Sequence, residues 1–127
     1  MARKSGRLRL ATRPARSQHP KVSFVCVPTP IPGGQEPSDV HVSTAVSRFL
    51  GTANKGDVLI IESSIGAGTT DRIGGMISKA EYQPGKDIGL AFCPERIDPQ
   101  NTRWTLENTP RIIYLSLIHI SEPTRPY

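Results

Sequence analysis

The chain has 127 residues, enough for one small domain, and its 36% hydrophobic and 6% aromatic content is low for an independent core. Its two cysteines lack CxxC spacing and its three histidines are scattered, so no metal site is predicted. No apolar stretch approaches the roughly 20 residues that cross a bilayer. No secretory leader is evident either, so we expect a cytoplasmic protein without membrane association, whose cysteines stay reduced.

The net charge of +5 is concentrated at the amino-terminal end. The first 21 residues hold seven basic side chains and no acidic one, so residues 22–127 together carry −2. Such a segment is typical of a nucleic-acid-binding arm and also of an organelle transit peptide. It contains no aromatic residues that could stack on bases, which argues against the first interpretation.

Three short apolar runs predict buried strands. They are Val22 to Val27, Val58 to Ile61 and Ile88 to Phe92, and nearly continuous runs of this kind are typical of parallel strands covered on both faces. Cys26 falls inside the first run and is predicted to be a small buried hydrophobe.

An amphipathic helix is predicted between the first two strands. One face carries apolar residues at helical spacing: Val42, Ala45, Val46, Phe49 and Leu50. Ser38 or Asp39 can cap its amino end. Gly51 is suited to the left-handed residue that closes many helices.

A second helix is predicted to begin at Thr69 or Thr70, with Asp71 in its first turn and Ile73, Met76 and Ile77 facing inward. The resulting β-α-β-α-β order predicts an α/β fold with a partial Rossmann-like parallel sheet. In such sheets ligands bind beyond the carboxyl ends of the strands. Polar loops follow all three strands: VCVPTP at 25–30, ESSIGAGTT at 62–70 and FCPERIDP at 92–99.

The sequences of these loops resemble those of the UDP-glucose/GDP-mannose dehydrogenases, also called the nucleotide-sugar dehydrogenase family. The resemblance runs from about Gly6 to Ile113 and includes a fourth motif, LENTPRII at 106–113. It implies oxidation of the C6 alcohol of a UDP-sugar to a carboxylate with two NAD, in a homodimer that assembles through a central domain absent here. The chain resembles only the second half of the NAD-binding domain, so we expect it to be inactive alone.

The resemblance also implies roles for residues in the loops. Pro28, Thr29, Ser63, Ser64 and Gly68 match cofactor-contacting positions, and Ser64 replaces a threonine whose hydroxyl helps hold the reactive water. Gly68 allows close approach of the backbone, and Gly66 stands where the family more often has proline. Taken alone, the two serines could simply cap a helix, which is the commoner role for such residues.

The PERIDP segment matches family positions that take part in catalysis and substrate binding. By resemblance Glu95 is the base that activates water in the hydrolysis step, and Arg96 and Ile97 contact the nucleotide sugar. The segment is closest to the UDP-N-acetylhexosamine branch. An adjacent Glu95 and Arg96 are also consistent with a solvated surface pair.

Half of the cofactor site is missing from the sequence. No G-x-G-x-x-G fingerprint follows a strand to seat the pyrophosphate, and no acidic residue follows a second strand to bind the ribose. Neither Cys26 nor Cys93 is assigned as the family's nucleophile. The expected domain organisation is therefore a basic segment at 1–21, the second half of the NAD-binding domain at 22–114, and a tail at 115–127.

Both terminal segments depart from the family pattern. GRLRLAT at 6–12 resembles the family's link into the first strand, so residues 13–21 are interpreted as local divergence or a reading-frame error. LSLIHISEPTR at 115–125 resembles the translation of a transposase adapter used in sequencing libraries, which predicts a non-native tail. The alternative is that Leu115 to Ile120 form a strand.

The competing function is that of a small α/β binding module with a basic nucleic-acid-binding arm. The enzyme-fragment interpretation predicts no retention of the chain on immobilised DNA at physiological salt, because the basic segment lacks stacking residues that would add to its charge. Chromatography of the chain and of a version lacking residues 1–21 checks this. Retention that disappears with the truncation would favour the binding module.

Overall fold

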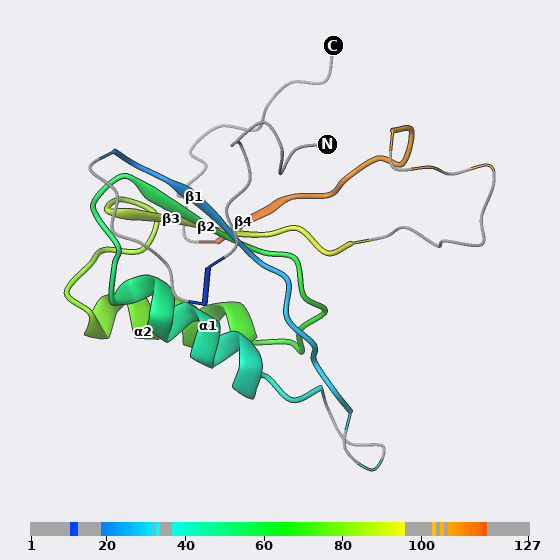
Figure 1. The fold of residues 1–127 in the computed structure, drawn as a ribbon, viewed down its shortest axis with the longest axis horizontal. Coiled ribbons are helices and arrows are strands. Elements are labelled where there is room, and N and C mark those ends of the chain that lie inside the picture. The colour runs from blue at the N-terminus through cyan, green and yellow to red at the C-terminus, as the bar shows by residue number, and fades with distance from the viewer. Residues whose placement is uncertain are drawn as a thin grey trace.

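The computed structural model describes residues 11–12, 19–31, 33, 37–95, 103, 105 and 107–116. Within this part the chain forms one sheet in the order β1-β2-β3-β4 and two helices (Figure 1). The elements are β1 (Val22–Val25), α1 (Val40–Leu50), β2 (Asp57–Ile61), α2 (Thr69–Lys79), β3 (Ile88–Phe92) and β4 (Tyr114–Ser116). No helix among the described residues is long and apolar enough to span a membrane.

Strands β1, β2 and β3 are parallel and paired in sequence order. Val25 lies opposite Ile61, and Ile61 lies opposite Phe92. Both crossovers step in the same direction across the sheet, and right-handed crossovers of this kind place their helices on the same face. Figure 1 shows α1 and α2 together below the sheet. The predicted α/β fold with a β-α-β-α-β parallel sheet is confirmed.

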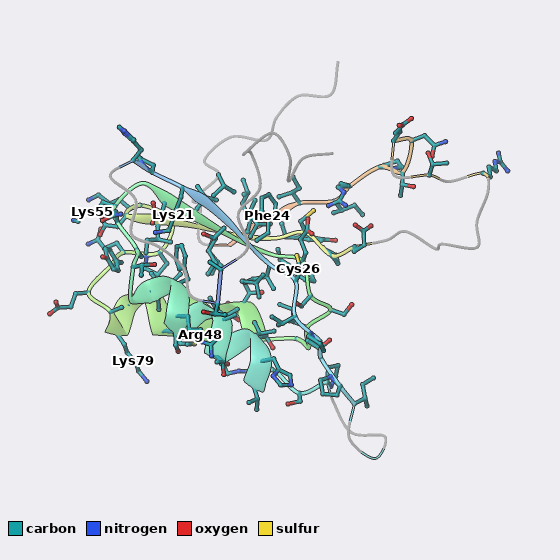
Figure 2. All side chains as sticks on the ribbon, in the orientation of Figure 1. Lys21, Phe24, Cys26, Arg48, Lys55 and Lys79 are labelled. Carbon is teal, nitrogen blue, oxygen red and sulfur yellow. The ribbon has the colours of Figure 1, made fainter. Side chains whose placement is uncertain are left out.

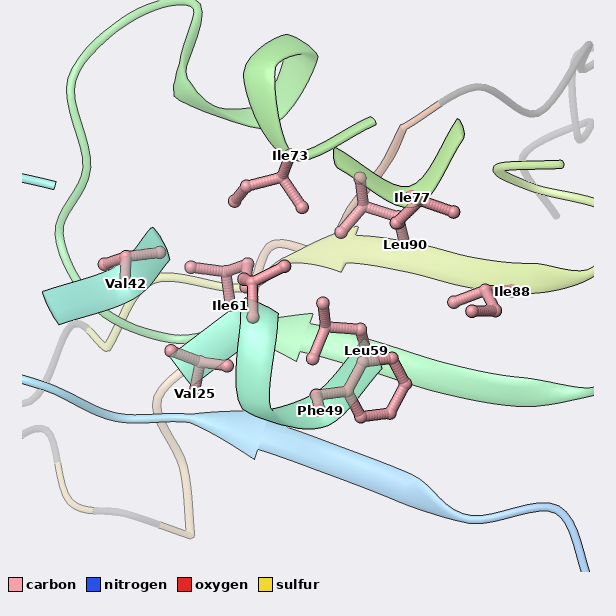
Figure 3. Packing of buried hydrophobic residues seen from close by; sticks show 10 residues of the cluster. Val25, Val42, Phe49, Leu59, Ile61, Ile73, Ile77, Ile88 and Leu90 are labelled. Carbon is pink, nitrogen blue, oxygen red and sulfur yellow. The ribbon is translucent and has the colours of Figure 1, made fainter. Parts of the chain in front are cut away.

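The core lies between this sheet face and the two helices (Figure 3). Alternate strand residues point toward the helices because successive side chains of a strand lie on opposite faces. Burial of each large aliphatic side chain stabilises the fold by about 1.5–3 kcal/mol. The core side chains are Val25, Leu59, Ile61, Ile88 and Leu90 from the strands and Val42, Val46, Phe49, Ile73 and Ile77 from the helices.

Both helices have the predicted buried faces, and α2 begins at Thr69 with Asp71 in its first turn as predicted, but the caps of α1 differ from the prediction. Asp39 occupies the N-cap position of α1 without a side-chain capping bond, because its carboxylate accepts a hydrogen bond from Arg72 Nε of α2 at 3.1 Å. Gly51 has φ −62°, so the predicted left-handed closure is wrong. The chain continues in a tight turn, with Thr52 N–H donating to Phe49 O, and the positive φ of 89° falls at Gly56.

The fourth strand is antiparallel to β3. Tyr114 lies opposite Phe92 and Ser116 opposite Leu90, and the rings of Phe92 and Tyr114 stack with centroids 6.2 Å apart. The parallel three-stranded prediction did not include this strand, although it overlaps the alternative strand at Leu115 to Ile120 in its first two residues. It contains the first two residues of the segment predicted to be a non-native tail, and residues 117–127 of that tail lie outside the described part of the chain.

A buried ion pair fastens the amino-terminal end of the sheet. Asp57, the first residue of β2, is fully buried, and its carboxylate lies 3.1 Å from Lys21 Nζ. It also accepts hydrogen bonds from the backbone N–H groups of Lys21 and Asn54, both at 2.9 Å. The Lys21 ammonium donates to Thr52 O at 2.7 Å and lies over the Phe49 ring. This one carboxylate therefore joins the start of β1 to the turn after α1.

The pKa of Asp57 is lowered below its usual value. Burial acts to raise the pKa, but the hydrogen bonds from Asn54 and Lys21 and the Lys21 charge together outweigh it. The folded state therefore favours the charged form of Asp57 more than the unfolded chain does. The stability that this carboxylate contributes to the fold is fully present above about pH 4 and is lost as the pH falls further.

We predict that Asp57→Asn lowers the free energy of unfolding at pH 7 by about 3 kcal/mol, because it removes one partner of a buried ion pair. Urea unfolding followed by circular dichroism measures this. The variant should also lose less stability than the parent between pH 5 and pH 3. Lys55→Ala, which breaks the exposed pair with Asp87, is the control and should leave stability unchanged; equal effects of the two substitutions would contradict the prediction.

Candidate functional site

The three polar loops meet along one edge of the sheet. The parallel hydrogen bonding continues past the strands, since Glu62 N–H and Ser63 N–H both donate to Val25 O, at 2.9 and 3.1 Å, and Cys93 N–H donates to Ile61 O at 2.9 Å. The residues after β1, β2 and β3 therefore lie side by side. We call this edge, formed by residues 26–30, 62–68 and 93–95, the carboxyl rim.

Ser63 holds two of these loops together. It is buried, and its Oγ accepts a hydrogen bond from Val27 N–H at 2.8 Å. Its hydroxyl lies 3.2 Å from Val25 O and 2.9 Å from Val27 O, so it donates to the backbone of the first loop. Ser63 thus fixes the start of the segment that carries Pro28 and Thr29. Its predicted contact with the cofactor stays a prediction.

The other predicted cofactor residues lie on the same rim with their side chains less enclosed. Ser64 and Pro28 are exposed, and Thr29 is half-buried. Pro28 lines an open hollow of about 670 Å³ between β1 and α1, together with Cys26, His41 and Arg48. Neither predicted serine caps α2, because Gly68 occupies that position.

Gly68 has φ +76° immediately before α2. An added Cβ would meet no atom within 4 Å, so the backbone conformation, and not crowding, favours glycine here. The loop from Ile65 to Gly68 lines a second hollow of about 450 Å³, with Phe92 and Tyr114 on its opposite side. Gly68 therefore presents open backbone at the amino end of a helix, and its predicted contact with the cofactor stays a prediction.

A cluster of charges lies at the centre of the rim. Arg111, in the segment before β4, donates from Nη1 to Glu62 Oε1 at 2.7 Å and from Nη2 to Glu95. The hydrogen bond to Glu62 and the charge of Glu95 raise the pKa of Arg111. Sequence reasoning gave no role to Glu62 or Arg111, although both lie in motifs that carry the family resemblance. Their pairing spans 49 residues, and no local spacing indicates it.

Cys26 is exposed, so the prediction that it is a buried residue within a strand is wrong. β1 ends at Val25, and the Cys26 thiol lies 3.4 Å from Glu62 Oε2. Figure 2 shows Cys26 at the opposite end of the sheet from Lys21 and Lys55. Partial burial and then the hydrogen bond and charge of Glu62 raise the pKa of the thiol, and the charge of Arg111 opposes this.

Two predicted substrate contacts, Arg96 and Ile97, lie outside the described residues. No group of three metal-ligating side chains occurs in the part of the chain that the structure describes. The rim fits one side of a dinucleotide site, since it offers an exposed hydroxyl at Ser64, a loop held by Ser63 at Val27 and open backbone at Gly68. The fingerprint that would bind the pyrophosphate is not in the sequence.

Parallel strands, one layer of crossover helices and a polar carboxyl rim define this as part of a dinucleotide-binding α/β domain. The description of the matching family model is more specific: "UDP-glucose/GDP-mannose dehydrogenase family, NAD binding domain", over residues 1–115. The chain belongs to this family, and NAD is the cofactor of the domain. The predicted resemblance is confirmed.

Individual relatives agree with this assignment. The chain is 31% identical to a UDP-N-acetyl-D-mannosamine dehydrogenase of Yersinia pestis over 89% of its own length and 28% of the relative's. It is 37% identical to an enzyme of the same name from Methanococcus aeolicus, covering 86% of the chain and 24% of the relative. The chain thus spans about a quarter of the length of these relatives.

Solved structures show the same fold. A UDP-N-acetyl-mannosamine dehydrogenase from Staphylococcus aureus superposes with a TM-score of 0.69 at 32% identity, over 76% of this chain and 23% of that one. The corresponding enzyme of Pyrococcus horikoshii superposes with a TM-score of 0.58 at 30% identity, over 61% of this chain and 19% of that one.

We predict that Ser63→Ala lowers the free energy of unfolding by about 1–3 kcal/mol, because Val27 N–H loses its buried acceptor. Ser64→Ala is the matched control, since its neighbouring hydroxyl is exposed, and it should leave stability unchanged. Urea unfolding of both variants measures the difference. A similar loss in both would mean that Ser63 does not hold the rim together.

Proposed function

We propose that the chain forms part of the NAD-binding domain of an enzyme that oxidises the C6 alcohol of a UDP-linked N-acetylhexosamine to a carboxylate. The names of the relatives, which are UDP-N-acetylmannosamine dehydrogenases, support this substrate class. The overall reaction consumes one alcohol, one water and two NAD⁺, and yields one carboxylate, two NADH and three protons. NAD, when bound, supplies the hydride acceptor for each oxidation.

The single observation that carries the proposal is the gathering of Ser64, Gly68 and Glu95 on one rim beyond three parallel strands. We infer that Pro28, Thr29, Ser64 and Gly68 bound the cofactor, and that Ser63 fixes the loop on which Pro28 and Thr29 lie. Arg96 and Ile97 follow Glu95 directly in the sequence and are proposed to contact the nucleotide sugar.

Glu95 is proposed to activate water in the second half of the reaction. Its carboxylate is 43% exposed, so water can reach it. A carboxylate that accepts a proton from water makes that water a better nucleophile toward an acyl intermediate. Ser64 follows β2 in the neighbouring loop of the rim and offers a hydroxyl that can orient the same water.

The proposal places this chain in a larger enzyme. Because the chain spans about a quarter of its relatives and lacks the glycine-rich fingerprint, we expect no oxidation of UDP-sugar by these 127 residues alone. The complete enzyme is proposed to be a cytoplasmic homodimer that assembles through a domain outside this chain. Nucleic acid is not a proposed partner.

We predict that Glu95→Gln in the complete enzyme lowers the rate of carboxylate formation about 100-fold or more, the usual contribution of a general base. NAD affinity should change little, because a neutral amide of the same shape remains on the rim. Stopped-flow NADH absorbance and NAD titration measure the two quantities. Glu107→Gln, at an exposed position, is the control; equal losses of rate and of NAD affinity in Glu95→Gln would remove the role assigned to Glu95.

A further inference from the structure

Arg111 connects two carboxylates that come from different strands. Glu62 follows β2 and Glu95 lies three residues beyond β3. Arg111 contacts each with a different nitrogen of one guanidinium group, Nη1 for Glu62 and Nη2 for Glu95. Such a planar fork can hold two acceptors in a fixed geometry, whereas the single ammonium of a lysine acts as a point charge.

The backbone that carries Arg111 is itself fixed against the rim. Three residues after Arg111, Tyr114 begins β4 and pairs with Phe92, the last residue of β3. Their rings also stack. The segment before β4 therefore runs beside the segment after β3, and Arg111 meets Glu95 across the two. The antiparallel strand thus has a consequence for the site, because it delivers a cation between two carboxylates.

The positive charge of Arg111 allows the carboxylates of Glu62 and Glu95 to lie close together. Two carboxylates close together repel each other, and a guanidinium between them replaces the repulsion with two attractions. The side chains of Arg111 and Glu95 are both more than a third exposed, so the pair contributes little to overall stability. Its effect is on where the Glu95 carboxylate lies.

We propose that Arg111 is a positioning residue for Glu95, holding its carboxylate at the rim between the ends of β2 and β3. The inference rests on the proposed role of Glu95 in activating water. Arg111 itself is not assigned a contact with substrate or cofactor. Its contribution is to restrict the base to one place, and restriction of this kind is a large part of catalytic rate.

Cys26 reports on the cluster within the 127-residue chain. Its thiol lies 3.4 Å from Glu62 Oε2, which is bound to Arg111 through its other carboxylate oxygen, and only the thiolate reacts with iodoacetamide. Arg111→Gln removes a positive charge that lowers the pKa of Cys26, so alkylation at pH 8 should slow by about twofold or more. Glu62→Gln removes a carboxylate that raises this pKa, so alkylation should become faster.

These opposite effects distinguish a change in charge from structural loosening. Loosening would relieve the partial desolvation that raises the pKa of the Cys26 thiol and would accelerate alkylation in both variants. Cys26→Ser gives the background rate of the buried Cys93. Arg72→Gln, which breaks the ion pair with Asp39, is the control arginine and should leave the rate unchanged. An unchanged or faster rate in Arg111→Gln would show that the cluster does not form and would overturn the inference.

The positioning role is tested in the complete enzyme with Arg111→Lys and Arg111→Gln. Both variants should lower kcat for carboxylate formation by about tenfold or more with KM for NAD unchanged, because a lysine keeps the charge but not the fork. Full kcat in both variants would overturn the inference even if the alkylation result holds. Failure of this inference can be distinguished from failure of the proposed function. If the proposed function is wrong, the unmodified enzyme forms no NADH from UDP-sugar.

Discussion

The in-register parallel pairing of β1, β2 and β3 is the constraint on which the rest of the structure depends. Parallel strands end at the same edge, and here the hydrogen bonds continue one or two residues beyond them, to Glu62, Ser63 and Cys93. Because the backbone fixes these starting points, short loops are sufficient to gather hydroxyls, carboxylates and open backbone on one rim. A shift of one residue in any strand would turn alternate side chains from the core to the opposite face and would misplace the loop that follows.

Charged groups fasten both ends of this sheet, but in different environments. At the amino end, Asp57 is fully buried and satisfied by Lys21 and two backbone N–H groups, so it contributes to stability. At the carboxyl end, Arg111 joins Glu62 to the more exposed Glu95, where solvent weakens the energy of the pair. The first arrangement holds the fold together. The second leaves a carboxylate accessible to water, as a base requires.

Much of the fold was predictable because apolar spacing directly reflects burial. The spacing of Val42, Val46 and Phe49 predicted the buried face of α1, and Ile88 to Phe92 has the same bounds in the sequence prediction and in the structure. The errors fall at element ends, where several contacts compete. Asp39 binds Arg72 in place of its own helix, Gly51 continues a tight turn, and Cys26 lies just past the last strand residue, where it is exposed.

The sequence by itself determined the α/β class, the order of the elements and the family, because periodicity and motifs are local properties of the chain. It also placed Ser64, Gly68 and Glu95 in loops after strands. Only the tertiary structure decided that Ser63 binds the loop after β1, that an antiparallel β4 pairs with β3, and that Arg111 lies between Glu62 and Glu95. These contacts join residues from 16 to 49 positions apart, and their partners are chosen by the pairing of strands in space, which no local pattern encodes.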